Sequence, residues 1–329
     1  MEMDKLIAQF PKHISDAIEI ANNYDFTSFA TKKFSAVVIC GMGGSGIGGR
    51  LAKEWFSDTA SCPIVLVQDY DLPGFVDSTT LVIASSYSGN TEETLSAVKS
   101  GAEKGAVVVG ITSGGGLLKF CKDNNFEAVK LPGGNPPRSM VAFSVIQLIN
   151  ILAGAGIVAT NALTSFKNCK LLLTKELVEI KGQAKALAKF AHKKHLIIYS
   201  PTNLEGVAIR CRQQVNENAK QLCWHHVIPE MNHNELVGWA GGSEAYAVLY
   251  LDSKFLNERN RLRFKLNQEI ISKKSPHSLV LTPKGETLVE EAFYLIHIID
   301  WASVYLSEMN EVDAVEVRVI DYLKGELAK

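Results

Sequence analysis

One short run of the sequence combines residue types that can bind a phosphate group without a charged side chain. The run is Ser86-Tyr87-Ser88-Gly89-Asn90-Thr91, which follows an apolar stretch at residues 81–84 and opens a helical pattern. Ser88 and Thr91 carry hydroxyl donors, Gly89 lets the chain turn, and the amides of the next helix's N-terminus add donors and a positive dipole end. Capping that helix would use only one of these side chains. The run therefore predicts a phosphate site in preference to a simple helix cap.

A second segment, residues 41–49, is rich in glycine and follows another apolar stretch at residues 36–40. We expect a tight loop here before a helix, because glycines let the backbone approach an anion or a sugar closely. Gly41, Gly43 and Gly46 also fit the GxGxxG pattern of dinucleotide-binding folds, and Asp69 lies near the place of that pattern's acidic residue. Nicotinamide binding is therefore an alternative for this segment alone.

Arg138 precedes a long apolar segment, in the run Pro136-Pro137-Arg138-Ser139. Two prolines restrict this loop, so that a permanent cation is held with little conformational freedom. Such a cation can stabilise the negative oxygen of an enediolate. A surface arginine on a loop is the alternative interpretation.

Glu217 and His233 lie 16 residues apart, in the runs Asn216-Glu217-Asn218 and Asn232-His233-Asn234-Glu235. They stand on either side of an apolar stretch at residues 222–227 that predicts a strand. We expect both side chains to reach one crevice. A solvated carboxylate at a helix end and a loop histidine bonded to the backbone are the alternatives.

Short apolar stretches alternate with helical patterns along the chain, as they do in βαβ units. Because these stretches are continuously apolar, they predict strands covered by helices on both faces, and hence parallel sheets. The sequence thus predicts an α/β fold with two doubly wound parallel sheets, in closely packed domains at residues 1–157 and 158–329. A long helical pattern at residues 162–193 opens the second domain. The predicted strands are residues 36–40, 64–67, 81–84 and 106–111, then residues 195–199, 222–227, 245–251 and 278–281.

Composition and charge exclude several classes of protein. The 329 residues include 34 basic and 35 acidic side chains, for a formal net charge of -1, which provides no attraction for nucleic acid or an anionic membrane. Six cysteines without metal-type spacing predict buried thiols, and the N-terminus lacks the pattern of a signal peptide, so we expect a cytoplasmic protein. The apolar segment at residues 140–159 contains Gln147 and Asn150 and predicts a buried core or interface helix rather than a membrane span.

The serine-rich run and the glycine-rich segment together resemble those of sugar isomerase (SIS) domain proteins. The resemblance implies that Ser86, Ser88 and Thr91 hold a substrate phosphate, with Gly44 and Ser45 beside the sugar. It marks a superfamily strongly and does not identify a reaction.

All of these motifs, in this order over most of the chain, resemble one family of SIS proteins, the bifunctional phosphoglucose/phosphomannose isomerases. The resemblance implies that Glu217 moves a proton between C1 and C2, that Arg138 stabilises the enediolate and that His233 opens the sugar ring. It also implies a homodimer in which His233 acts in the partner's site, and a lysine, best matched by Lys324, that completes the site. Val317 departs from the small hydroxyl residue of dual-specificity members, which weakens the expectation of activity on mannose 6-phosphate.

The function implied by this resemblance is an aldose–ketose isomerase that interconverts glucose 6-phosphate with fructose 6-phosphate, with mannose 6-phosphate as a second aldose. The first domain would bind the phosphate, and the second would supply the base and the ring-opening groups. Such an exchange needs neither cofactor nor metal, and the implied partner is a small sugar phosphate. Two alternatives stay open: a non-catalytic sugar-phosphate sensor, and an isomerase for another aldose phosphate such as arabinose 5-phosphate.

Overall fold

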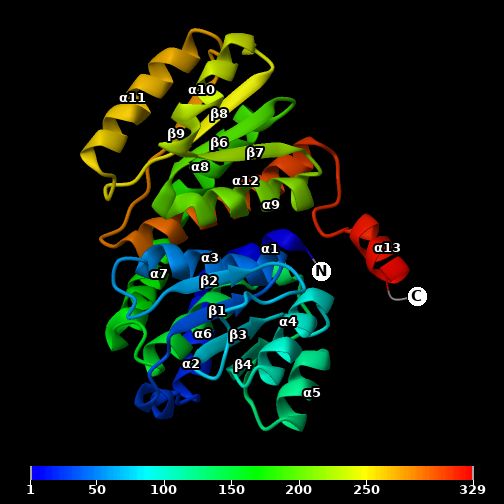
Figure 1. The fold of residues 1–329 in the computed structure, drawn as a ribbon. Coiled ribbons are helices and arrows are strands. Elements are labelled where there is room, and N and C mark those ends of the chain that lie inside the picture. The colour runs from blue at the N-terminus through cyan, green and yellow to red at the C-terminus, as the bar shows by residue number, and fades with distance from the viewer. Residues whose placement is uncertain (1, 328–329) are drawn as a thin grey trace. The chain divides into compact units, whose positions relative to one another are not determined.

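The computed structural model describes residues 2–327, and the contacts between them divide the chain into two compact units. The N-terminal unit consists of residues 9–174 and 285–290, and the C-terminal unit consists of residues 2–8, 175–284 and 291–327. Each unit is built around its own parallel sheet with helices on both faces (Figure 1). The predicted α/β class with two parallel sheets is confirmed.

The N-terminal unit contains five parallel strands in the order β2-β1-β3-β4-β5. The four predicted strands are confirmed to within one residue at each end. The strand β5 is an addition, because the exposed Glu127 and Lys130 interrupt its apolar pattern at the edge of the sheet. The strands are β1 (Ala36–Cys40), β2 (Ile64–Val67), β3 (Thr80–Ser85), β4 (Val107–Thr112) and β5 (Glu127–Lys130).

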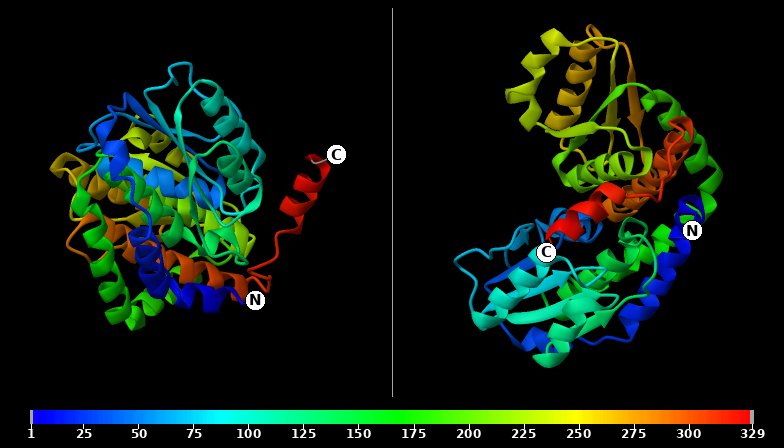
Figure 2. Two further views of the ribbon diagram at one scale, coloured as in Figure 1. Left: turned by 90° about the horizontal axis from the view of Figure 1, so that it is seen from below. Right: turned by 90° about the vertical axis from the view of Figure 1, so that its right-hand side faces the viewer.

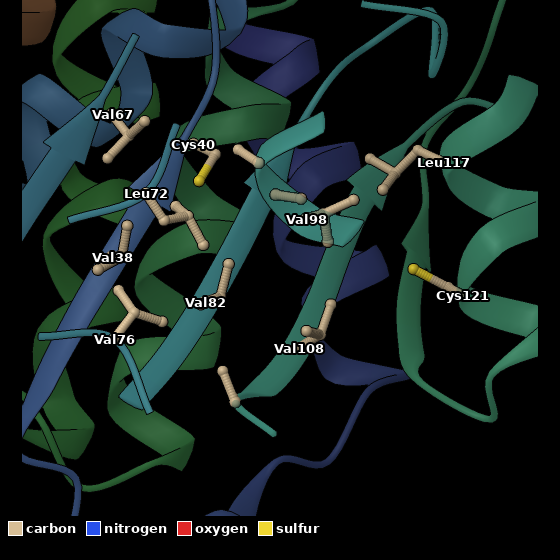
Figure 3. Close-up of a cluster of buried hydrophobic side chains, with 13 residues drawn as sticks. Val38, Cys40, Val67, Leu72, Val76, Val82, Val98, Val108, Leu117 and Cys121 are labelled. Carbon is tan, nitrogen blue, oxygen red and sulfur yellow. The ribbon is translucent and has the colours of Figure 1, made fainter. Parts of the chain in front are cut away.

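Helices cover both faces of this sheet, with α3 and α6 on one side and α4 and α5 on the other. Figure 3 shows the second interface, where alternate side chains of β1, β3 and β4 face Val98 of α4 and Leu117 of α5. The apolar runs of the strands are therefore buried on both sides, which is the condition that a parallel sheet requires. The helices of this unit are α2 (Phe10–Asn22), α3 (Gly43–Phe56), α4 (Glu92–Glu103), α5 (Gly115–Asp123), α6 (Val141–Gly154) and α7 (Thr164–Lys175), with short turns η1 (Thr27–Thr31), η2 (Pro137–Ser139) and η3 (Thr160–Leu163).

Helix α3 begins at Gly43, so the prediction of a glycine loop extending to residue 49 is wrong. Only Gly41 and Met42 separate the helix from β1. A Cβ atom at Gly46 would lie 2.4 Å from the carbonyl oxygen of Gly41, so a side chain there would push the helix away from the strand. The glycines therefore let the first turn of α3, with its free amides, lie directly behind the end of β1.

Helix α6 confirms the prediction that the apolar segment forms a buried helix, since almost all of its residues are buried. Its two amides bind the backbone of α2: the Gln147 Nε2 donates to the Ala17 carbonyl at 2.6 Å, and the Asn150 Nδ2 donates to the Ala21 carbonyl at 3.1 Å. The side-chain NH2 groups of both residues that interrupt the apolar pattern are therefore hydrogen-bonded inside the unit.

Across residues 2–327, the structure contains no helix that is both long enough and apolar enough to cross a membrane.

The C-terminal unit contains four parallel strands in the order β7-β6-β8-β9, and the four predictions are confirmed to within two residues at each end. Helices α8 and α9 lie on one face of this sheet, and α11 lies on the other (Figure 1). The strands are β6 (His195–Pro201), β7 (Cys223–Ile228), β8 (Tyr246–Leu251) and β9 (Ser278–Leu281). The helices are α1 (Met3–Ala8), α8 (Leu177–Ala191), α9 (Glu205–Ala219), α10 (Glu235–Gly238), α11 (Glu258–Ser272), α12 (Leu288–Met309) and α13 (Arg318–Leu327), with short turns η4 (Thr202–Leu204), η5 (Glu230–His233) and η6 (Trp239–Gly241).

The helix predicted over residues 162–193 is divided into α7 and α8, and the prediction of one continuous helix is wrong. The division lies at Glu176, whose carboxylate binds the Lys284 ammonium at 2.7 Å. Lys284 also binds Glu179 at 2.5 Å, so one cation from far along the chain binds both the break residue and the first turn of α8. A contact over this sequence distance leaves no local pattern.

The cysteines confirm the prediction of buried thiols. All six are free within the described chain, and five of them are buried. Burial raises the pKa of Cys40 to about 12 and that of Cys121 to about 11. These thiols therefore stay protonated and behave as small apolar side chains.

Candidate active site

The two motifs with phosphate chemistry lie at the point where the first sheet changes winding direction. Strand β1 lies between β2 and β3, with Cys40 next to Ala84. The helix after β1 is α3 and the helix after β3 is α4, and they cover opposite faces of the sheet. Open parallel sheets bind ligands at the carboxyl ends of such diverging strands. Residues 41–45 and residues 86–91 thus meet where a ligand is expected.

The hydroxyls of the serine-rich turn face one another instead of capping α4. The Ser86 Oγ lies 2.8 Å from the Thr91 Oγ1, and the Gly89 N–H donates to the Ser86 Oγ at 3.2 Å. Thr91 occupies the N-cap position of α4, but its side chain makes no capping bond. Asn90 accepts the Gly116 N–H at 2.9 Å. The alternative interpretation as a simple helix cap is therefore wrong, and the first turn of α4 presents amides that these side chains leave uncapped.

The turn itself depends on Gly89. Its φ of +74° is in the left-handed region, and a Cβ atom there would lie 1.8 Å from the carbonyl oxygen of Gly114. The Leu117 N–H donates to the Gly89 carbonyl at 2.8 Å, which fixes the turn against the start of α5. Ser88, in contrast, is exposed at the outer side of the turn.

Tyr87 connects the serine-rich turn to the other predicted residues of this unit. Its N–H donates to the Ser45 Oγ at 3.0 Å, which joins the turn to the first turn of α3. Its hydroxyl donates to the Pro132 carbonyl at 2.7 Å and accepts the Asn135 N–H at 3.3 Å, so it also holds the loop that leads to Arg138. Burial raises the pKa of Tyr87, and the bonds from Asn135 oppose that shift.

Arg138 is only 6% exposed, so the alternative of a surface arginine is wrong. It lies in η2, where the Ser139 N–H and hydroxyl both donate to the Pro136 carbonyl, at 2.9 and 2.8 Å. The backbone of Gly44 packs against it so closely that a Cβ atom there would lie 3.2 Å from the Arg138 Cα. The N-terminal unit thus brings Gly44, Ser45, the serine-rich turn and Arg138 together.

Glu217 lies half-buried in the last turn of α9, whose orientation is set by polar contacts with α12. Arg210 donates two hydrogen bonds to Asp300, at 2.7 and 3.0 Å, and both side chains are buried. Gln214 donates to the same carboxylate at 2.9 Å, and Asn218 donates to the Ser303 hydroxyl at 2.8 Å. Residues 210, 214 and 218 are four apart, so they share one face of the helix.

The expectation that Glu217 and His233 reach one crevice is wrong for a single chain. Glu217 precedes β7 at the amino end of that strand, and His233 follows it at the carboxyl end, in η5. Six residues of extended chain separate the two ends by roughly 20 Å. Because both residues lie in the C-terminal unit, no change in the position of the N-terminal unit can bring them together.

Lys324 lies on α13, which stands apart from the rest of the C-terminal unit (Figures 1 and 2). All ten residues of this helix are exposed, including Val319 and Tyr322. The structure therefore does not bring Lys324 to Glu217 through packing of α13. Within residues 2–327, the structure contains no group of three or more His, Cys, Asp or Glu side chains that could hold a metal ion.

Comparison with known proteins adds two family models and several relatives. Residues 31–128 match the SIS domain, and residues 180–327 match the bacterial phospho-glucose isomerase C-terminal SIS domain. The bifunctional phosphoglucose/phosphomannose isomerase of Caldicellulosiruptor bescii is 33% identical over 99% of this chain and 99% of its own length. That of Aquifex aeolicus is 34% identical over 90% of this chain and 91% of its own. The chain belongs to the bifunctional phosphoglucose/phosphomannose isomerase family.

One further relative of this chain is named for a different activity, and several solved structures resemble it in fold at low sequence identity. A D-glucosamine-6-phosphate 4-epimerase from Sulfolobus acidocaldarius is 27% identical over 89% of the chain. Among solved structures, the C-terminal domain of glucosamine-fructose-6-phosphate aminotransferase from Francisella tularensis matches with a TM-score of 0.77 at 15% identity, over 96% of this chain and 98% of that one. The Escherichia coli tagatose-6-phosphate ketose/aldose isomerase matches with a TM-score of 0.70 at 17% identity, over 96% and 95%. These structures confirm the fold.

Lys220 is a residue of this family member to which the sequence analysis assigned no role. Its ammonium donates to the carbonyls of Glu217, Asp313 and Glu316, at 2.6, 2.6 and 2.7 Å. It therefore ties the turn that carries Glu217 to the segment that leads into α13 and Lys324. The sequence shows a lysine at the predicted end of a helix. The left-handed backbone conformation of Lys220 and its carbonyl partners far along the chain are visible only in the tertiary structure.

Glu235 is a second residue that the sequence analysis left without a role. Its carboxylate accepts the Tyr199 hydroxyl at 2.5 Å and lies 2.6 Å from the His226 Nδ1, and the Trp239 Nε1 donates to the Tyr199 oxygen at 2.8 Å. Burial raises the pKa of Tyr199, so its hydroxyl remains a donor. The segment that carries the exposed His233 is thereby held rigidly against β6 and β7.

Proposed function

We propose that this chain interconverts glucose 6-phosphate and fructose 6-phosphate by moving a proton between C1 and C2. The class of enzyme, a sugar-phosphate isomerase, follows from membership of the family. The observation that carries the proposal is the turn after β3, where the Ser86 and Thr91 hydroxyls lie 2.8 Å apart and neither caps α4. A group of hydroxyl and amide donors without a cation can bind a phosphate dianion and still release it with the product.

The other candidate residues divide the remaining chemistry between them. In the open-chain aldose, the Glu217 carboxylate takes the proton from C2, and the electrons move to the C1 carbonyl to form an enediolate. The O2 hydroxyl proton passes to O1, and the same carboxylate gives its proton to C1 while the C2=O double bond forms, which produces the ketose. Arg138 and Lys324 stabilise the negative oxygen, and His233 transfers the proton that opens the ring.

We propose mannose 6-phosphate as a second, weaker substrate. The names of the relatives from Caldicellulosiruptor bescii and Aquifex aeolicus include both activities. Mannose and glucose 6-phosphates give the same enediolate, so the choice between them depends on contacts at C2. Val317 stands immediately before α13, next to Glu316, whose carbonyl Lys220 binds. Its apolar side chain supplies no hydroxyl there, so we expect faster turnover of glucose 6-phosphate.

The test is an assay of a panel of aldose phosphates in heavy water: glucose, mannose, glucosamine 6-phosphate and arabinose 5-phosphate. We expect conversion of glucose 6-phosphate to fructose 6-phosphate with solvent deuterium at the exchanged carbon. Binding of glucose 6-phosphate without exchange would support a non-catalytic sensor. Turnover restricted to arabinose 5-phosphate would support a different isomerase.

The phosphate role predicts a large effect of removing two hydroxyls of the turn. The double variant Ser88→Ala with Thr91→Ala should raise KM by roughly 100-fold or more, because each hydrogen bond to a charged group contributes about 1.5–3 kcal/mol. The change in kcat should be much smaller, since the phosphate does not react. Ser96→Ala, one turn further along α4, is the matched control and should leave KM unchanged. An unchanged KM in the double variant would place the phosphate elsewhere.

We propose that His233 acts in the site of a second copy of the chain. Glu217 and His233 lie at opposite ends of β7, so a carboxylate and an imidazole that serve one sugar have to come from two chains. His233 is exposed, and its neighbours are fixed: Asn232 donates to Asn267 at 2.6 Å, and Asn234 donates to Glu230 at 3.1 Å. A rigid segment with one exposed histidine suits insertion into a partner, and a two-fold dimer would provide two such sites.

Hybrid dimers test this shared site. The variants Glu217→Gln and His233→Ala should each be nearly inactive alone. After mixed refolding, half of the dimers pair one variant with the other, and one of their two sites has both native residues. Activity should then return to about a quarter of the wild-type level. Mixtures that stay as inactive as the separate variants would show that both residues act within one chain.

A further inference from the structure

The second sheet contains a counterpart of the turn that we propose to bind phosphate. Each sheet starts from a central strand, crosses to a neighbour on one side, and returns to the other side: β1, β2 and β3 in the first, and β6, β7 and β8 in the second. Strand β8 therefore occupies the place in its sheet that β3 occupies in the first. The counterpart of the serine-rich turn is the turn after β8, at residues 252–255.

The hydrogen bonds of this second turn converge on a carboxylate of the same chain. The Ser253 hydroxyl donates to the Glu291 Oε2 at 2.5 Å, and the Lys254 N–H donates to the Oε1 at 3.1 Å. The Phe255 N–H donates to the Ser253 Oγ at 3.1 Å, so the hydroxyl proton is directed to the carboxylate. Ser253 and Glu291 are each 1% exposed.

In both turns a serine hydroxyl accepts an N–H of its own turn and faces a second oxygen atom, but that second atom differs. In the first turn, the Ser86 Oγ accepts the Gly89 N–H and faces the Thr91 hydroxyl. In the second, the Ser253 Oγ likewise accepts an N–H of its own turn, but it faces a carboxylate that α12 supplies from its first turn. A hydroxyl and an amide that both point at one oxyanion are the donors of a phosphate site.

We propose that the Glu291 carboxylate is an internal ligand that occupies the second unit's counterpart of the phosphate site. The comparison of the two turns rests on the proposed phosphate role of the first turn. The contact between Glu291 and the turn at residues 252–255 does not depend on that role. Because the ligand belongs to the chain, it binds without the entropy cost of a free anion. It excludes a phosphate both by filling the space and by its negative charge, so each chain holds one sugar phosphate.

Acetate provides a direct test, because Glu291→Ala removes the atoms of one acetate molecule. The variant should melt at a lower temperature than the wild type, since the buried Ser253 hydroxyl and the Lys254 N–H lose their acceptor. Acetate well above its dissociation constant should then raise the melting temperature by roughly 3–5 °C relative to the same concentration of chloride. The wild type and the isosteric Glu291→Gln should show no difference between acetate and chloride.

The donors themselves are tested by adding Ser253→Ala to Glu291→Ala, which should abolish most of the acetate effect. An equal effect of acetate on Glu291→Ala, Glu291→Gln and the wild type would contradict the proposal. Should Glu291→Ala not fold in chloride, its refolding yield in acetate against chloride is the readout, and equal yields would contradict it as well.

Calorimetric titration of the wild type with fructose 6-phosphate separates this inference from the proposed function. One molecule bound per chain is the expected result, and two per chain would overturn the claim that the second turn is filled. No binding at all, together with rescue of Glu291→Ala by acetate, would refute the proposed phosphate site and leave the internal carboxylate ligand standing.

Discussion

Replacing Glu217 by glutamine should lower kcat by roughly 10²–10⁴-fold, which is the range that general acid–base catalysis contributes. Glutamine has nearly the same shape and keeps the hydrogen-bonding capacity of the side chain, but it cannot accept the C2 proton at neutral pH. KM should therefore change little. The measurement is the conversion of glucose 6-phosphate to fructose 6-phosphate, with the exchange of deuterium at C2 as an independent readout.

Glu258→Gln is the control for this variant. It removes the same charge from an exposed position at the start of α11, in the same unit, and should leave both kcat and exchange unchanged. A Glu217→Gln enzyme that binds substrate and turns it over at close to the normal rate would show that another group is the base.

Replacing Arg210 by methionine should lower the free energy of unfolding by about 3–5 kcal/mol, because the variant leaves the buried Asp300 carboxylate without its cation. Arg210 and Asp300 are 1% and 4% exposed and are joined by two hydrogen bonds. Gln214 alone cannot balance a buried negative charge. Urea unfolding of the full chain, monitored by tryptophan fluorescence, measures the decrease in the free energy of unfolding.

Arg212→Met is the matched control, since it makes the same substitution two residues along the same helix at a partly exposed position. It should cost less than about 1 kcal/mol. The double variant Arg210→Met with Asp300→Leu should recover most of the stability lost by Arg210→Met, because it removes the unpaired charge along with its partner. Equal losses in the two arginine variants would show that the buried pair does not hold α9 to α12.

The contacts of α9 have a consequence for the proposed base. Arg210, Gln214 and Asn218 bind α12 along one face, and Lys220 binds the carbonyl of Glu217 itself. The last turn of α9 is therefore fixed both in rotation and at its end. A base that must take a proton from C2 and return it to C1 requires such fixed placement, since a small displacement of the reacting groups is costly in rate.

Local pattern was enough to predict most of the elements and the candidate phosphate turn. Continuous apolar runs predicted eight of the nine strands within residues 2–327, because a parallel strand that is buried on both faces has to be apolar throughout. The ninth, β5, is an edge strand with polar ends and carries no such pattern. The turn from Ser86 to Thr91 was predictable because its glycine and hydroxyl residues lie, in the sequence itself, directly between the end of a predicted strand and the start of a predicted helix.

The sequence by itself thus determined the fold class, every strand except β5, the buried helix α6 and the family to which the chain belongs, since all of these leave local patterns in the sequence. Tertiary structure alone decided that α3 begins at Gly43, that Arg210 meets Asp300, and that Glu291 fills the second turn. The physical reason is the same in each case: the partners lie in different elements, and only the pairing and packing of those elements brings them together.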